Sequence, residues 1–250
     1  MPVHDRIRFA TALVALPLGM AGAVAAAVAS TVDAGPTNPD AAIRAQVAKV
    51  NPDTVVGAIK DSPIPGLKEA TVDGQILYFT HDAKYLLAGD LIEVAKGRNL
   101  TEEGRASERA SRLAESPQDT HIVFGPKDNP KKVYVFTDTS CHYCQLFHKE
   151  VPALVAAGIT VEYLAWPRGG PRSPALAVMQ SVWCASDRAA AYELAIGEKQ
   201  VTPANCESPV RTQWELGMAL QVEGTPSIYT TDGRKVGGYV PAAALLEDLQ

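Results

Sequence analysis

The stretch Phe136-Thr-Asp-Thr-Ser-Cys141-His142-Tyr143-Cys144 decides the fold expected for this chain. An apolar run at residues 133–136 leads into it and predicts a buried strand. From about residue 143 to 157, apolar residues recur at helical spacing and predict a helix. A Cys-x-x-Cys therefore stands directly after a strand and in the first turn of a helix.

The position of this dithiol predicts its chemistry. The first helical turn has unpaired N–H groups and the positive end of the helix dipole, which stabilise an anion by about 0.3–1 kcal/mol at an exposed site. We therefore expect Cys141 to be a thiolate with a pKa below the ~8.5 of a free thiol, and to act as the nucleophile. His142 adds positive charge when protonated. Cys144 lies one turn further in and fits a shielded resolving thiol.

The dithiol has two other interpretations, a structural zinc site and a structural disulfide. A structural zinc site needs a second close pair of ligands, but the remaining cysteines, Cys184 and Cys206, are far apart in sequence. A purely structural disulfide within Cys-x-x-Cys would close a very small loop and constrain little of the unfolded chain. Redox chemistry is favoured, and we expect neither a metal nor a cofactor.

Cys184 and Cys206 are interpreted as a structural bridge. They enclose a helix and a loop, and the chain-entropy model assigns such a loop roughly 3 kcal/mol of stabilisation. A second redox pair remains the alternative. His121 and His148 have no partner visible in the sequence, so each is interpreted as a plain surface or packing residue.

Around the dithiol the pattern predicts an α/β domain. A strand, a helix and a second strand at 161–166 form a βαβ unit, which implies parallel pairing. An antiparallel edge and a closing helix follow. The remaining expected elements are helices at 174–184, 189–196 and 209–220, strands at 227–230 and 235–239 around an Asp232-Gly233 turn, and a helix at 242–249.

The first half of the chain predicts a short helix at 41–50 followed in sequence by a small antiparallel sheet. Asp73-Gly74 is a strong two-residue hairpin signal. A domain of about 65 residues has a marginal core, so pairing with a second copy would cover an open sheet face or edge. The expected strands are at 55–59, 67–72, 75–80, 85–88 and 91–95.

Residues 101–115 predict a helix with Thr101 as its N-cap. Its apolar stripe is thin, so we interpret it as a solvated rod of roughly 22 Å that joins two domains and ends at Ser116-Pro117. The alternative is that it packs in a core.

Residues 1–29 contain the successive regions of a secretory signal. Arg6 and Arg8 come first, and an uncharged stretch then runs to Ala29 and ends in small residues. An uncleaved membrane anchor is the alternative, but the stretch is mostly alanine and no basic cluster follows it. Export would place the cysteines where disulfides persist.

Composition excludes one class of function. The 250 residues are 46% hydrophobic and 20% charged, which is ordinary for a folded chain. The net charge is −5, from 23 basic and 28 acidic residues, and there is no Lys/Arg block. We expect no nucleic-acid partner.

A Thr-Pro at 225–226 precedes the strand at 227–230, and base rates alone predict a trans bond there. Together with the Cys-x-x-Cys it resembles the thioredoxin superfamily. Further motifs are similar to the DsbC/DsbG family of periplasmic disulfide isomerases over nearly the whole mature chain. They are Tyr163-Leu-Ala-Trp-Pro-Arg168, Val182-Trp-Cys184-Ala, Pro203-Ala-Asn-Cys206 and Val222-Glu-Gly-Thr-Pro226.

The sequence pattern and the resemblance together predict an organisation: signal peptide 1–29, N-terminal dimerisation domain 36–100, linker helix 101–120 and thioredoxin-like catalytic domain 121–250 with a helical insertion. It implies a V-shaped homodimer whose cleft receives unfolded protein, and a membrane electron donor of the DsbD type.

At the site, the resemblance implies that Cys141 is the nucleophile and Cys144 the resolver. It also implies that Thr225-Pro226 is a cis peptide beside them, placed to contact substrate, and it supports the Cys184–Cys206 bridge. The chain departs from the family at His142, where isomerases carry Gly and the DsbG branch carries Pro. This dipeptide, His142-Tyr143, tunes the redox potential and with it the balance of isomerase against oxidase.

The expected activity is that of a periplasmic thiol:disulfide interchange protein that rearranges or reduces incorrect disulfides in misfolded or misoxidised secreted proteins. A DsbG-like reductase of sulfenylated cysteines is the alternative within redox chemistry. A holdase chaperone that binds unfolded chains is the alternative from another class.

Overall fold

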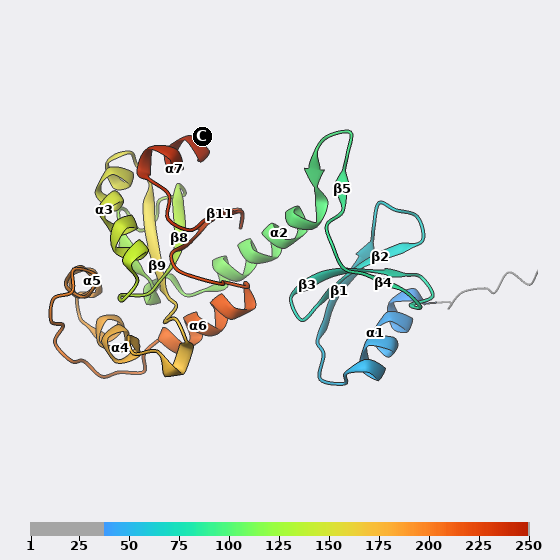
Figure 1. Ribbon diagram of the computed structural model, residues 1–250, viewed down its shortest axis with the longest axis horizontal. Helices are drawn as coiled ribbons and strands as arrows, with labels where there is room; N and C mark the ends of the chain where they lie inside the picture. The colour runs from blue at the N-terminus through green and yellow to red at the C-terminus, as the bar shows by residue number, and fades with distance from the viewer. Residues whose placement is uncertain (1–37, 250) are drawn as a thin grey trace, which may run out of the picture. The chain divides into compact units, whose positions relative to one another are not determined.

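The N-terminal part of the chain is a sheet with one helix packed on it. The computed structural model describes residues 38–249, so the expected signal peptide lies outside the described residues. Ile43 of the helix is fully buried against Ala70 and Phe79 of the sheet. The helix and the antiparallel strands, in spatial order, are α1 (Pro39–Val50), β1 (Val56–Asp61), β2 (Leu67–Val72), β3 (Gln75–Thr80) and β4 (Leu86–Leu87) (Figure 1).

The predicted Asp73-Gly74 hairpin is confirmed. Both residues have positive φ, 48° and 78°, and Val72 pairs with Gln75 across the turn. The turn needs this backbone conformation at both positions, and glycine adopts it without steric cost. A separate two-stranded ladder, β5 (Ile92–Glu93) and β6 (Arg98–Asn99), leads into the next helix.

Helix α2 (Leu100–Glu115) begins earlier than predicted, and its cap is Asn99 rather than Thr101. The Asn99 side chain accepts a hydrogen bond from the Glu102 N–H at 2.9 Å. Thr101 is buried instead: its hydroxyl lies 2.5 Å from the Tyr78 hydroxyl and accepts the N–H of Leu91. Both residue types can cap a helix. Asn99 is the cap here because the Thr101 side chain is bonded to a buried partner.

The interpretation of this helix as a solvated rod is wrong, because α2 docks on the C-terminal domain. Leu113 is 1% exposed and packs with Tyr134 and Phe136. Arg109 donates from Nε to the carbonyl oxygen of Gly233 at 2.7 Å. A Cβ at Gly233 would collide with the carbonyl oxygen of Ala106, so the two backbones are in contact.

The C-terminal domain is built on a mixed sheet of spatial order β11-β10-β8-β9-β7. β8 and β9 are parallel, as the βαβ pattern predicts, and the other neighbours are antiparallel. The pattern missed β7, which is only three residues long. The strands are β7 (Ile122–Phe124), β8 (Lys132–Thr137), β9 (Thr160–Ala165), β10 (Ser227–Thr230) and β11 (Lys235–Gly237).

Helices cover both faces of this sheet (Figure 1). Val133 and Val135 of β8 belong to one core, and Tyr134 and Phe136 belong to the other, as the two-residue period of a strand requires. The helices are α3 (His142–Ala156), α4 (Leu176–Cys184), α5 (Arg188–Ile196), α6 (Val210–Ala219) and α7 (Ala242–Asp248), with single 3₁₀ turns at Gln118–Thr120 and Gly170–Arg172. None of the helices between residues 38 and 249 has the length and apolar character that a membrane crossing requires.

Candidate active site

Cys141 is the residue that caps the N-terminus of α3, directly after the loop that leaves β8. It is 3% exposed, and in its thiol form Sγ donates to the carbonyl oxygen of Thr225 at 3.2 Å. The Thr225-Pro226 bond is cis, as the family resemblance implies and against the base rate for X-Pro bonds. The fold therefore brings the head of α3 and the loop before β10 together.

The two thiols of the Cys-x-x-Cys have opposite electrostatic environments. A hydrogen bond from the Cys144 side chain is the main reason that the pKa of Cys141 falls to about 5, against the effect of burial. The Thr225 side chain, the Cys144 N–H and the charge of Arg168 lower it further. Burial raises the pKa of Cys144. At neutral pH the site holds a thiolate at Cys141 and a protonated thiol at Cys144.

Asp138 holds the loop in front of Cys141. Its carboxylate is fully buried and accepts from the N–H and the hydroxyl of Ser140 at 2.8 and 2.7 Å, and from the N–H of Arg168 at 2.8 Å. The Arg168 guanidinium donates in turn to the carbonyl oxygen of Ser140 at 3.2 Å. Sequence reasoning did not select either Asp138 or Arg168, although Arg168 stands in one of the family motifs.

Exposed aromatic rings flank the dithiol. Tyr143 is 57% exposed, and its ring centroid lies 5.7 Å from that of His142 and 6.4 Å from that of Tyr239. The two residues between the cysteines therefore face outward, where they can contact a bound polypeptide.

His148 is a buried packing residue with polar partners, and the surface alternative for it is wrong. Nδ1 lies 3.1 Å from the Tyr163 hydroxyl, and Nε2 lies 3.2 Å from the carboxylate of Glu193. Burial lowers the pKa of His148, against the charge of Glu193.

His121 is likewise buried, in a cluster at the end of α2. Its Nδ1 lies 2.8 Å from the Glu162 carboxylate and its Nε2 lies 2.8 Å from the Ser116 hydroxyl. Lys132 and Gln118 contact the other oxygen of Glu162 at 2.8 and 2.6 Å. The sequence could not show this pair, because His121 and Glu162 meet only through the pairing of β7 with β9.

Cys184 and Cys206 are joined by a disulfide that closes a loop around α5. Cys141 and Cys144 are free thiols. Among residues 38–249, no three His, Cys, Asp or Glu side chains gather in a way that could hold a metal ion.

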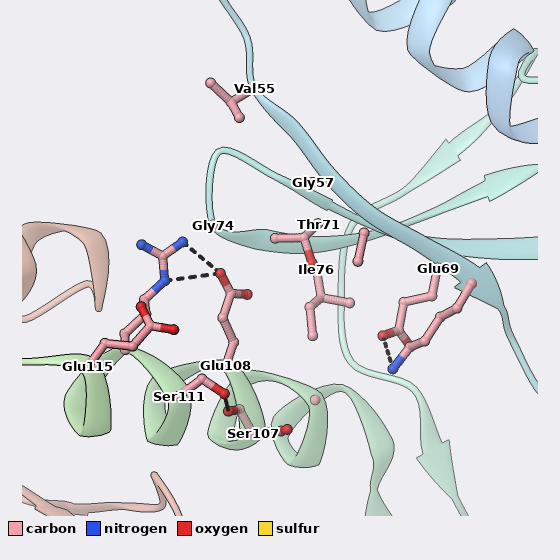
Figure 2. Close-up of a pocket in the computed structure, with 14 residues that line it drawn as sticks. Val55, Gly57, Glu69, Thr71, Gly74, Ile76, Ser107, Glu108, Ser111 and Glu115 are labelled. Carbon is pink, nitrogen blue, oxygen red and sulfur yellow. Dashed lines mark hydrogen bonds and ion pairs between the residues drawn. The ribbon is translucent and has the colours of Figure 1, made fainter.

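A cavity of about 630 Å³ lies between the N-terminal sheet and α2 (Figure 2). The small residues glycine and serine in its lining leave much of this space open, and Glu69 pairs with Lys60 at 2.9 Å on its wall. The dithiol does not line this cavity. We therefore locate the chemistry at the head of α3.

Comparison with known proteins decides the family. The N-terminal domain of disulfide bond isomerase proteins matches residues 34–102, and a thioredoxin-like domain matches residues 118–250. A relative from Haemophilus influenzae, named thiol:disulfide interchange protein DsbC, is 38% identical over 216 residues, which cover 84% of this chain and 90% of the relative. The chain belongs to the DsbC family.

Two further DsbC relatives agree. The protein of the same name from Escherichia coli K12 is 32% identical over a region that covers 84% of this chain and 87% of the relative. That from Dickeya dadantii is 36% identical over 75% of this chain and 78% of its own. These matches confirm the DsbC resemblance that the motifs indicated, and the thioredoxin-like fold class with it.

Proposed function

We propose that this DsbC-family protein rearranges or reduces incorrect disulfides in secreted proteins, with Cys141 as the nucleophile and Cys144 as the resolving thiol. The observation that carries this proposal is the opposite direction of the two thiol pKa shifts at the head of α3. A thiolate attacks a disulfide, whereas a thiol does not, so the first attack belongs to Cys141.

The reaction begins when the Cys141 thiolate attacks one sulfur of a client disulfide. A bond forms between Cys141 and that sulfur, the client S–S bond breaks, and the second client sulfur leaves as a thiolate. Thr225 and Pro226 lie beside the new bond and would contact the client chain there. The lowered pKa of Cys141 also makes it a good leaving group in the next step.

Two outcomes follow from this mixed disulfide. If another client thiolate attacks the client sulfur, a new client disulfide forms and Cys141 leaves as a thiolate, with no net oxidation. If Cys144 attacks the Cys141 sulfur, a Cys141–Cys144 disulfide forms and the client leaves reduced. The second outcome oxidises the protein by two electrons, so its repeat requires a reductant, for which we propose a membrane donor of the DsbD type.

The protein is proposed to work as a homodimer through its N-terminal sheet. β4 is an edge strand of only two residues, Leu86 and Leu87, each 52% exposed, and Tyr85 directly before it is 69% exposed. An edge with exposed apolar side chains is a surface that a second copy can cover. Two linked sites raise the effective concentration of a client for rebinding between exchanges.

The proposed location is the periplasm, reached through the expected signal at residues 1–29. The Cys184–Cys206 disulfide supports this location, because such bonds persist in oxidising compartments.

Refolding of a scrambled multi-disulfide protein tests the function. The wild-type protein should restore client activity in a mildly reducing buffer. Cys141→Ser should abolish this activity and keep client binding, whereas Cys144→Ser should accumulate mixed disulfides. Full refolding activity of Cys141→Ser would contradict thiol exchange at Cys141 and would favour the holdase alternative.

A further inference from the structure

The resolving step needs a base that the dithiol itself does not provide. Cys144 is fully buried, and burial raises the pKa of its thiol. The buried carboxylate of Asp138, on the loop before Cys141, already accepts hydrogen bonds from Ser140 and Arg168. Attack by Cys144 nevertheless requires that its proton leave.

We propose that a row of side chains behind Cys144 forms a proton relay that carries its proton to the surface during resolution. This inference deepens the proposed function and rests on it. The side chains of the row are called the relay residues, and in order from Cys144 they are Thr137, Tyr192, Tyr163, His148 and Glu193.

The inner half of the relay consists of hydroxyl groups in the core. The Thr137 side chain partly offsets the raised pKa of Cys144, and its Oγ1 lies 2.7 Å from the Tyr192 hydroxyl. The rings of Tyr192 and Tyr163 pack against each other with centroids 4.6 Å apart, and each tyrosine influences the pKa of the other. Thr137, Tyr163 and Tyr192 have no exposed surface.

The outer half reaches solvent through a histidine. The Tyr163 hydroxyl lies 3.1 Å from Nδ1 of His148, and Nε2 of His148 lies 3.2 Å from the Glu193 carboxylate. The Glu193 side chain is 57% exposed. The row therefore runs from a group with no solvent contact to one that is mostly in water.

One assignment of hydrogens satisfies every group in the row. In the mixed disulfide Cys141 is no longer a thiolate that accepts from Cys144, so Cys144 donates to Thr137, Thr137 to Tyr192, Tyr192 to Tyr163, and Tyr163 to Nδ1 of His148. The Nε2–H of His148 then donates to the carboxylate of Glu193. Each hydroxyl donates once and accepts once, which is the arrangement a proton shift along the row requires.

The acid–base properties of the histidine and the two tyrosines suit proton transfer. Burial lowers the pKa of His148, so its ring is neutral at neutral pH and Nδ1 can accept a proton. Burial raises the pKa of Tyr163 and Tyr192 well above the ordinary value. The tyrosines therefore pass a proton on without remaining ionised.

The resolving step balances as follows. The S–H bond of Cys144 breaks, each hydroxyl passes one proton outward, and Nδ1 of His148 gains one. The Cys144 sulfur bonds to the Cys141 sulfur, the bond from Cys141 to the client sulfur breaks, and the client leaves as a thiolate that takes a proton from water. The imidazolium pairs with Glu193 and then releases its Nε2 proton to solvent.

Rapid mixing of the reduced full-length protein with dithiobis(nitrobenzoate) separates the two attacks. The first nitrothiobenzoate released reports attack by Cys141, and the second reports attack by Cys144. Tyr192→Phe breaks the row without changing the ring. It should slow the second release at least about tenfold, a smaller loss than removal of a general base usually causes. The first release should be unchanged. His148→Gln removes the acceptor and should act in the same way.

Tyr229→Phe is the matched control. Tyr229 also has a buried hydroxyl, which has no hydrogen-bond partner within the part of the chain that the structure describes, and it lies on the other face of the sheet. Both releases should be unchanged in this variant. In heavy water the second release should slow in the wild type, and the effect should shrink in Tyr192→Phe.

The outcomes separate the two proposals. A wild-type protein with no first release contradicts the proposed function. A normal first release with a second release within twofold of wild type, in both Tyr192→Phe and His148→Gln, contradicts the relay alone.

Discussion

The Sγ atom of Cys141 lies 3.2 Å from the carbonyl oxygen of Thr225, a residue 84 positions later in the chain. The proposed nucleophile and the cis-proline loop are thus a single site made by two distant segments. A client sulfur bonded to Cys141 would lie against this loop, and the lowered pKa of Cys141 keeps the attacking group ionised there.

The first prediction concerns the pH dependence of thiol labelling. The pKa of Cys141 is lowered to about 5, so its thiolate is lost only as the pH falls through that value. Labelling of Cys141 by iodoacetamide should be nearly constant from about pH 6 to 8 and should decline about tenfold per pH unit well below 5. Peptide mapping should find Cys144 unlabelled in the same samples. A labelling midpoint near pH 8.5 would contradict the assignment of Cys141 as a stabilised thiolate.

The second prediction concerns the bridge around α5. Cys184–Cys206 should remain oxidised under mild thiol treatment that reduces the pair Cys141 and Cys144. Replacing both bridge cysteines with Ala should lower the free energy of unfolding by about 3 kcal/mol, measured by urea denaturation. Four free thiols after mild treatment would show that the bridge is itself redox-active.

The third prediction concerns the buried carboxylate at the end of α2. Burial raises the pKa of Glu162, but hydrogen bonds from His121, Lys132 and Gln118 outweigh it, so the net pKa is lowered. The native state therefore gains stability above the unfolded pKa of ~4.3 and loses it as the pH falls through the lower folded value. Glu162→Gln should cost about 3 kcal/mol at pH 7.

Acid titration and a surface variant check this prediction. The stability difference between wild type and Glu162→Gln should shrink below about pH 4, because protonation then removes the same charge from the wild type. Glu215→Gln breaks an exposed pair with Arg211 and should cost less than about 1 kcal/mol at either pH. An equal difference at pH 7 and pH 3 would exclude this account.

The fourth prediction concerns the docking of α2. Gly233 has φ +79°, and a Cβ there would collide with Ala106 of α2. Gly66 has φ +84° with nothing within 4 Å of its Cβ position, so it carries the same backbone strain without the collision. Gly66→Ala should cost about 1–2 kcal/mol, and Gly233→Ala should cost more and expose α2 to protease. Leu113→Ala should cost about 2–5 kcal/mol. Equal stability of the two glycine variants would show that the close contact is not needed.

The fifth prediction concerns the edge of the N-terminal sheet. Leu86→Lys with Leu87→Lys should make the protein monomeric in sedimentation velocity and should lower its activity on a scrambled client. Activity toward a small disulfide should be unchanged, because Cys141 lies in the other domain. Met218→Lys, at a residue that is 51% exposed on α6, is the control and should remain dimeric. A dimeric edge variant would require another interface.

The features that sequence predicted well are local. The Asp73-Gly74 turn and the helix that begins directly after Cys141 depend on neighbouring residues, and both are where the pattern placed them. The docking of Leu113 depends instead on a cluster assembled from distant strands, which a thin stripe of one helix could not reveal. β7 is too short to show an alternating pattern.

In the site, too, the local features were predictable from sequence and the features assembled from distant segments were not. The Cys-x-x-Cys is visible as a motif, and the lowered pKa of Cys141 follows from its place at a helix start. The groups behind it are not visible, because Thr137, Tyr163 and Tyr192 stand on three separate elements. A buried tyrosine looks the same in sequence whether its hydroxyl serves packing or proton transfer.

The Cys184–Cys206 disulfide encloses α5, the helix that carries Tyr192 and Glu193. If the relay operates, a newly synthesised chain must have its own bridge formed by another oxidant before it can resolve mixed disulfides through Cys144 efficiently. Until then Cys141 could still capture a client and rearrange its disulfides, but release of a reduced client through Cys144 would be slow. A protein that repairs the disulfides of others would in this sense depend on the formation of its own.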